Sequence, residues 1–112
     1  MTYEAFDVVV VPFPFADRNS TKRRPALVLS GLTAFNSASR HSVLAMITSA
    51  KNSSWPLDIE IIDLDAVGLP SPSMIRMKLF TLDHQLILRK LGRLGERDRA
   101  AAARTLKALF QC

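Results

Sequence analysis

The sequence predicts a mainly β protein, a small and partly open barrel of five or six short strands packed by one C-terminal helix. Short runs rich in β-branched and other apolar residues recur along the first nine-tenths of the chain, with polar or proline-containing segments between them. Only the last part of the chain carries apolar residues at helical spacing. Because 112 residues leave room for one core, we expect a single domain over residues 1–112.

Six segments are predicted to be strands. The first, residues 6–13, is a β-branched run that we expect to be buried and to end at Pro12. The polar segment that follows, residues 16–24, has loop composition. The fourth predicted strand alternates polar and apolar residues and should have one wet face. The five later strands are predicted at residues 25–30, 42–49, 57–61, 74–78 and 87–94.

The chain ends in a predicted amphipathic helix over residues 97–110. Acidic residues near its start and Lys107 near its end suit the helix dipole. Its expected buried face consists of Ala102, Ala103, Leu106, Leu109 and Phe110.

The charge of the chain points to an anionic partner. Fifteen Lys and Arg residues against ten Asp and Glu give a net charge of +5, and such small basic domains often bind nucleic acid. One cysteine excludes a disulfide scaffold and a cysteine-based zinc cluster, and two histidines disfavour an all-histidine site, so we expect no metal and no cofactor. An acidic N-terminus and short apolar runs indicate a cytoplasmic protein that does not enter a membrane.

The first candidate functional cluster is Lys22-Arg23-Arg24 before Pro25. The proline restricts Arg24 to an extended conformation, so the following strand fixes the direction of its guanidinium. A guanidinium presents a fork of donors that matches phosphate oxygens. The alternative is a solvated charge cluster.

A second cluster lies where the predicted strand 42–49 gives way to a polar segment. Thr48 and Ser49 place two hydroxyls there that could donate to a phosphate oxygen; the alternative is a plain turn at the strand end. Lys51 follows in the polar segment. Trp55 could stack on a nucleobase beside these hydroxyls, or it could fill the core.

A third cluster lies on the predicted strand 74–78. Arg76 and Lys78 should point to one face of that strand, while Ile75 and Met77 point to the core. Two cations side by side repel each other unless a polyanion or an acidic partner lies over them. The alternative is a solvated outer face.

Taken in order, the segments DVVVVPFPF, KRRPALVLS, ITS, GLPSPSMIRMKLFTLD and LRKLGRLGERD resemble the PemK/MazF-type toxin family over nearly the whole chain. The resemblance implies an SH3-like barrel of the PemK/MazF/CcdB type with a C-terminal α-helix, usually a homodimer. It also implies the toxin of a type II toxin–antitoxin pair, neutralised by a cognate acidic antitoxin. Such a toxin is an endoribonuclease that cuts single-stranded RNA, often mRNA, at short sequences without metal.

The resemblance carries over to individual residues. Arg24 matches the arginine of the family's Arg-Pro motif, and Thr48 and Ser49 match its Thr-Ser pair at a strand end. Arg76 matches the arginine of an Arg-x-Asp pair found in some relatives, but Lys78 stands where those relatives carry the aspartate. The glutamate or histidine that some relatives carry before the Arg-Pro motif is absent here.

These residues are compatible with a ribonuclease in which the substrate's own 2′-hydroxyl attacks the adjacent phosphorus. The arginines would stabilise phosphoryl charge and Thr48 would donate a hydrogen bond. The general base is left open between Asp17 in the polar loop and an uncharged Lys78. The predicted catalytic residues are Arg24, Thr48, Arg76 and Lys78. The residues predicted to bind RNA are Lys22, Arg23, Ser49, Lys51, Trp55 and Asp17.

A function of another class stays open, because one fold hosts several functions. The same barrel could carry a non-catalytic CcdB-like toxin that binds a protein target such as DNA gyrase, or a module that binds nucleic acid without cleaving it. The cations Arg24, Arg76 and Lys78 favour a phosphate substrate, whereas the missing carboxylates favour the non-catalytic alternatives.

Overall fold

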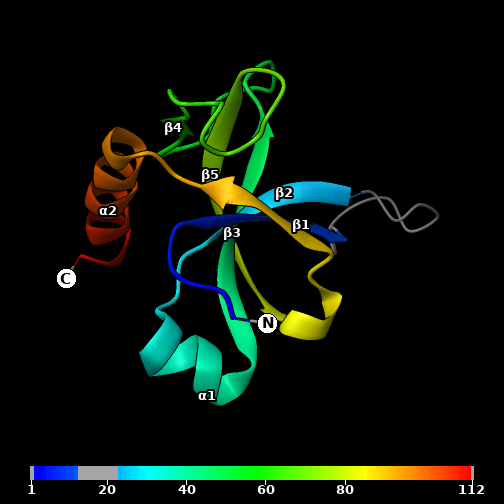
Figure 1. Ribbon diagram of the computed structural model, residues 1–112. Coiled ribbons are helices and arrows are strands. Elements are labelled where there is room, and N and C mark those ends of the chain that lie inside the picture. The colour runs from blue at the N-terminus through cyan, green and yellow to red at the C-terminus, as the bar shows by residue number, and fades with distance from the viewer. Residues whose placement is uncertain (1, 13–22, 112) are drawn as a thin grey trace.

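The computed structural model describes residues 2–12 and 23–111. Six strands form one antiparallel sheet in the order β4-β5-β3-β2-β1-β6, and α2 (Glu96–Phe110) stands beside it (Figure 1). The strands are β1 (Asp7–Pro12), β2 (Arg23–Val28), β3 (His41–Ser49), β4 (Ile59–Glu60), β5 (Ser73–Asp83) and β6 (Arg89–Arg93). The short helical elements are η1 (Leu32–Asn36), α1 (Ser37–Ser39) and η2 (His84–Leu86). The expectation of a mainly β fold with a C-terminal helix is therefore confirmed.

The central strands bury side chains on both faces of the sheet. Val8 and Val9 follow each other in β1 and are both fully buried, as are Leu27 and Val28 in β2. Successive side chains of a strand point to opposite faces, so each pair supplies one residue to each of two cores. This explains why the sequence shows continuous apolar runs here rather than alternation.

Different segments of the chain cover the two cores. The helix-side core includes residues from five strands or their flanking loops, and Ala102 of α2 packs into it. The opposite core includes Tyr3 from the N-terminal segment and Ile87 from the segment before β6. The strand residues of the helix-side core include Val8, Leu27, Ala45, Ile47 and Ile75, and those of the opposite core include Val9, Val11, Ala26, Val28 and Leu44.

Several strand boundaries differ from the expectation, and three of the differences have a clear cause. Strand β2 begins at Arg23 rather than at residue 25, because Arg23 and Arg24 pair with the end of β1. Strand β5 continues to Asp83, because it pairs with β3 from Ser73 onward. The predicted strand 57–61 shrinks to β4, since Leu57 adopts a positive φ of 66° that cannot continue an extended strand.

Helix α2 buries a narrower stripe than expected. Asp98 and Ala102 are buried, and Leu106 is half-buried against the helix-side core, which is the spacing of one helix face. The Asp98 carboxylate accepts the backbone N–H groups of Ile62 and Asp63 at 3.0–3.1 Å, so the first turn of the helix is the part fixed to the sheet. The expected burial of three residues is wrong because they lie off this stripe or beyond its packed part: Ala103, Leu109 and Phe110.

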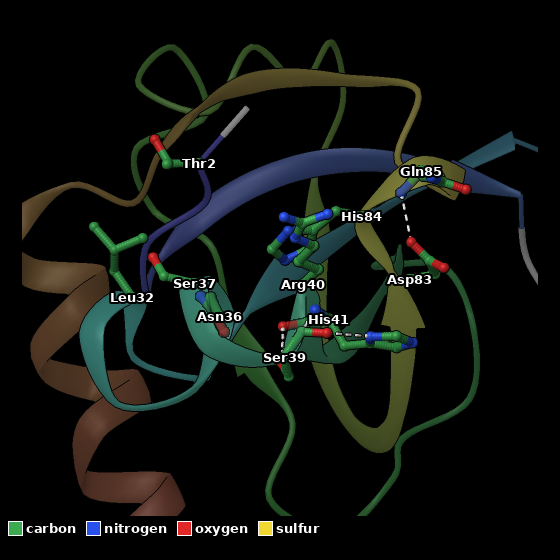
Figure 2. A pocket seen from close by; sticks show the side chains of 10 residues that line it. All are labelled: Thr2, Leu32, Asn36, Ser37, Ser39, Arg40, His41, Asp83, His84 and Gln85. Carbon is green, nitrogen blue, oxygen red and sulfur yellow. Dashed lines mark hydrogen bonds between the residues drawn. The ribbon is translucent and has the colours of Figure 1, made fainter.

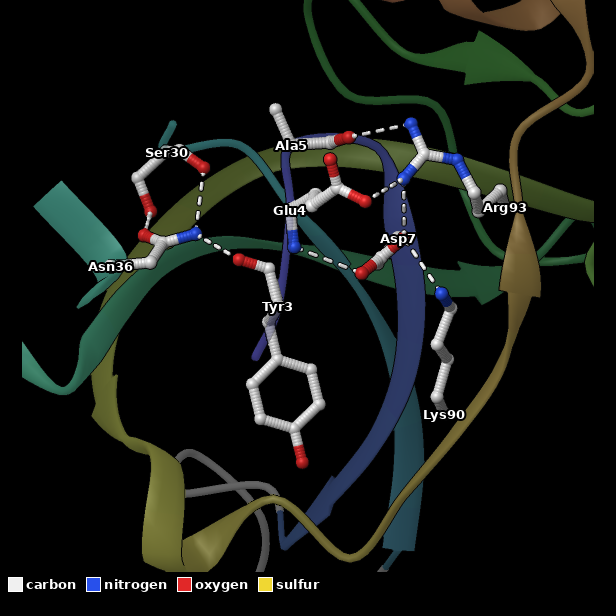
Figure 3. A network of polar contacts seen from close by, with 8 residues as sticks. All are labelled: Tyr3, Glu4, Ala5, Asp7, Ser30, Asn36, Lys90 and Arg93. Carbon is white, nitrogen blue, oxygen red and sulfur yellow. Dashed lines mark hydrogen bonds and ion pairs between the residues drawn. The ribbon is translucent and has the colours of Figure 1, made fainter. Parts of the chain in front are cut away.

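A buried carboxylate fastens the N-terminal segment to the edge strand β6 (Figure 3). Asp7 pairs with Arg93 at 2.9 Å and with Lys90 at 3.3 Å, and it accepts the backbone N–H of Glu4 at 2.9 Å. Two of the cations on β6 are thereby neutralised within the chain. Among the described residues, no helix is long and apolar enough to cross a membrane.

We predict that Gly92→Ala destabilises the fold. A Cβ added to Gly92 would lie 2.2 Å from the carbonyl oxygen of Ala66, and backbone cannot move aside as a flexible side chain can. Urea denaturation should show a loss of about 2 kcal/mol in the free energy of unfolding.

The matched control is Gly31→Ala, since a Cβ there meets nothing within 4 Å and Gly31 has an ordinary φ of −74°. Its free energy of unfolding should stay within about 0.5 kcal/mol of the parent's. Equal stability of the two variants would contradict the close packing of β6 against Ala66.

Candidate functional site

Polar side chains gather at one end of β2, β3 and β5, beyond the opposite core. Directly paired residues of antiparallel strands point to the same face, and the register pairs Ala26 with Met46 and Met46 with Arg76. Two residues further along their strands, Arg24 and Thr48 point to that face as well. Strand pairing therefore places Arg24, Thr48 and Arg76 on one face at one end of the sheet.

Arg76 is a buried cation bound to the loop that follows β3. Its Nε donates to Oδ1 of Asp58 at 3.2 Å, and its Nη2 donates to Oδ2 at 3.0 Å and to the carbonyl oxygen of Ser53. The two charged side chains are only 8% and 11% exposed. Asp58 is thus the acidic partner of Arg76, and the pair holds the loop against the sheet.

Trp55 lies over these cations. Its indole ring has the Nζ of Lys78 at 4.4 Å and the Cζ of Arg76 at 5.9 Å from its centroid, both within the range of a cation–π interaction. The backbone N–H of Trp55 donates to Oδ2 of Asp58 at 2.9 Å. Because Trp55 remains 41% exposed, it forms a platform at the surface rather than a filling of the core.

Lys78 owes its position to an irregularity in the pairing of β3 with β5. Met46 pairs with Arg76, but Ala45 pairs with Leu79, so β5 carries two extra residues between these pairs. Met77 is buried in the helix-side core, whereas Lys78 is exposed and forms no ion pair with any described residue. Arg76 and Lys78 do point to one side, as strand alternation predicts, and meet at Trp55.

The hydroxyl cluster at the end of β3 has two different environments. Thr48 is buried, and its Oγ1 accepts a hydrogen bond from Nδ2 of Asn52, so its own hydroxyl proton can be donated elsewhere. Ser49 is exposed, and its Oγ accepts the backbone N–H of Lys51 at 3.2 Å. Lys51 itself is exposed in the turn.

Two of the remaining expected residues lie at the start of β2. Arg24 is half-buried and Arg23 is exposed. Asp17 and Lys22 lie outside the described residues, so the structure gives them no place.

Sequence reasoning missed Asp58 and Asn52. Asp58 falls in the segment predicted as an alternating strand and was not among the expected site residues, yet it binds both Arg76 and the Trp55 backbone. Asn52 stands four residues after Thr48 in a polar turn, which is the one signal that could have suggested its contact.

A separate cavity of about 610 Å³ lies at the other end of β3 and β5 (Figure 2). Nε2 of His84 hydrogen-bonds Oγ of Ser42 at 2.8 Å. Burial, and next the charge of His41, lowers the pKa of His84 below its ordinary value. Asp83 accepts the backbone N–H of Gln85 at 2.9 Å, and Nδ1 of His41 contacts the carbonyl of Ser39 at 2.8 Å. These polar groups contact one another and the nearby backbone at this end of the sheet.

In residues 2–12 and 23–111, no three His, Cys, Asp or Glu side chains cluster in a way that could hold a metal ion.

The family comparison agrees with this geometry. A family model described as the PemK-like, MazF-like toxin of type II toxin–antitoxin systems matches residues 4–110. The chain belongs to this toxin family. A comparison with curated proteins gives no match.

Solved structures share the toxin's fold. The MazF toxin of Deinococcus radiodurans is 23% identical with a TM-score of 0.75, over 100% of this chain and 99% of that chain. A mycobacterial endoribonuclease in complex with its cognate antitoxin is 13% identical with a TM-score of 0.75, over 98% and 94%. The Mycobacterium tuberculosis toxin MazF-mt6 is 18% identical with a TM-score of 0.71, over 94% and 96%. The expected MazF-type barrel is confirmed.

We predict that Asp58→Ala releases the loop and destabilises the toxin. The substitution leaves the buried guanidinium of Arg76 without its carboxylate, which costs about 3 kcal/mol in the free energy of unfolding. Trp55 is the only tryptophan, so its fluorescence reports on this loop alone, and acrylamide should quench it more strongly in the variant.

The control is the double variant Asp58→Ala/Arg76→Met, which removes both charges. Because it leaves no unpaired buried charge, urea denaturation should show a smaller loss than for Asp58→Ala alone. Equal losses in the two variants would mean that Asp58 does not stabilise the charge of Arg76.

Proposed function

We propose that this toxin is a metal-independent endoribonuclease that cleaves single-stranded RNA, including mRNA, at short sequences. The observation that supports the proposal is that Arg24 and Thr48 share one face at the ends of β2 and β3, and that Lys78 of β5 lies against the exposed Trp55 on that side of the sheet. Cations and a hydroxyl donor suit a phosphate, and an exposed indole suits an unstacked base. Membership of the MazF-like toxins and the likeness to a mycobacterial endoribonuclease support the same activity.

In the proposed reaction the 2′-oxygen of the substrate attacks the adjacent phosphorus, and the bond from phosphorus to the 5′-oxygen breaks. The products are a 2′,3′-cyclic phosphate and a 5′-hydroxyl, so the protein supplies no nucleophile. Arg24 binds the non-bridging oxygens, where charge grows in the transition state, and the Thr48 hydroxyl donates to one of them. One proton must leave the 2′-hydroxyl and another must reach the 5′-oxygen.

The hydrogen bonds of Asp58 and Arg76 bear on the roles proposed for the other residues. Both carboxylate oxygens of Asp58 already accept hydrogen bonds, so Asp58 holds Arg76 and Trp55 in position and is a poor proton acceptor. The proton acceptor is left to Asp17 or to the amine form of Lys78. A direct contact of Arg76 with phosphate stays a prediction, since its Nε and Nη2 are occupied.

We also propose that the toxin works as a homodimer in the cytoplasm and is neutralised by a cognate acidic antitoxin. The net charge of +5 supports an acidic partner. The mycobacterial structure that contains a cognate antitoxin supports the same kind of partner.

The cleavage proposal predicts that the purified toxin cuts a long RNA in excess EDTA and leaves 5′-hydroxyl ends, which end labelling detects. Arg24→Ala should lose roughly a hundred- to a thousandfold in rate, as expected for a donor to transition-state charge. Arg104→Ala, which removes an exposed arginine of α2, should keep the parental rate.

Intact RNA at high enzyme concentration, or activity that EDTA abolishes, would contradict this proposal. RNA that is bound but never cut would favour a module that binds without cleavage. Absence of binding as well would favour a toxin with a protein target such as DNA gyrase.

Lys78→Met should lower the cleavage rate at least tenfold, because it keeps the apolar stem and deletes the one cation over Trp55 that has no ion-pair partner among the described residues. Comparing the pH profiles of the variant and the parent separates the two roles of Lys78. Loss of the base changes the shape of the profile, whereas loss of a phosphate ligand lowers the rate without changing the shape. A variant that cuts at the parental rate at every pH would make Lys78 a surface residue.

A further inference from the structure

A second basic surface lies where β6, β1 and β2 meet, and it shares only Arg24 with the candidate site. It is a groove of about 600 Å³ in which three of the lining residues are arginines and none is acidic. The groove is lined by Val10, Arg23, Arg24, Pro25, Leu88 and Arg89. We call it the arginine groove.

Strand register builds the groove from one row of residues. Val10 of β1 pairs with Pro25 of β2 on one side and with Arg89 of β6 on the other, so these three side chains share a face. Arg23 stands two residues before Pro25 and points to that face too. Two guanidinium groups therefore flank an apolar floor of Val10 and Pro25.

The two outer arginines are not neutralised within the described part of the chain. Arg23 and Arg89 are exposed, and neither forms an ion pair or a side-chain hydrogen bond with a described residue. Their neighbours on β6 behave differently, since Lys90 and Arg93 both pair with Asp7. Both guanidinium groups are therefore available to an anionic ligand.

The chemistry of the groove selects the phosphate backbone of a nucleic-acid strand. Guanidinium groups bind phosphate oxygens through paired donors, and an apolar floor suits the sugar or base between two phosphates. Arg23 and Arg24 both line the groove, although strand alternation turns Arg24 toward the face of the sheet that carries Thr48. Because a nucleic-acid strand carries one phosphate per nucleotide, it can present one phosphate to each arginine as it crosses the start of β2.

We propose that the arginine groove binds the backbone of the substrate strand on one side of the scissile phosphate, with Arg23 and Arg89 as phosphate ligands. This inference rests on the proposed function, because it assigns the flanking nucleotides of the same substrate. It adds Arg89 to the residues that contact RNA. Binding of flanking phosphates by Arg23 and Arg89 positions the strand so that its scissile phosphate lies near Arg24.

The test compares two double variants that remove the same charge. The probe is a fluorescent single-stranded oligodeoxynucleotide of about twelve nucleotides, which carries the phosphates but lacks the attacking 2′-hydroxyl. Affinity is measured against salt concentration, where each phosphate contact contributes about 0.7 to the slope of log K against log salt. Arg23→Ala/Arg89→Ala should lower this slope by about 1.4. Arg97→Ala/Arg104→Ala, on the exposed side of α2, should leave it unchanged.

An equal slope in the two double variants would overturn the proposal. A second outcome would also overturn it. If Arg23→Ala/Arg89→Ala keeps the parental slope for the oligodeoxynucleotide but no longer binds a glutamate-rich peptide that the parent binds, the groove is a peptide site. Cleavage of RNA by the parent is measured in a separate assay, which tests the ribonuclease proposal independently of the groove. A parent that cuts no RNA but shows the predicted slope change would refute the ribonuclease and keep the groove, whereas normal cleavage with an unchanged slope would refute only the groove.

Discussion

Burial of both sheet faces leaves β2 and β3 only their ends for polar side chains. Leu27 and Val28, or Leu44 and Ala45, are consecutive and fully buried, so the middle of these strands has no face open to water. Arg24 and Thr48 stand at the same end because the strands are antiparallel and the register is fixed by the two cores. A slip of one residue would turn both side chains to the helix-side core.

The Asp58–Arg76 ion pair fixes the position of the loop that carries Trp55. Two buried charges gain little net stability, because desolvation offsets much of their attraction, so the pair matters chiefly for position. Its bidentate geometry and the contact of Asp58 with the Trp55 backbone hold the loop after β3 against β5. Lys78 and Trp55 can then lie together at the surface, with the indole exposed to a base and the ammonium beside it. The arginine groove adds further cations beside this site, around the start of β2.

Sequence reasoning was most successful where local pattern decides the structure. The buried strands β1 and β3 and the two faces of residues 75–78 follow from β-branched runs and strand alternation. It failed where the deciding contact joins distant segments. Asp58 and Arg76 are 18 residues apart, and no periodicity reports their contact. The face of α2 was misassigned for the same reason, since Asp98 binds backbone 35 residues away and sets the helix orientation.

The central claim is that single-stranded RNA binds at this strand end with a base on Trp55. Titration of the toxin's tryptophan fluorescence with an uncleavable oligodeoxynucleotide tests it most directly, because Trp55 is the only tryptophan in the chain. The account predicts saturable quenching, since a stacked base lies on the exposed indole, and weaker binding in Arg24→Ala. An oligonucleotide that binds by mobility shift but leaves the fluorescence unchanged would place the nucleic acid elsewhere and contradict the account.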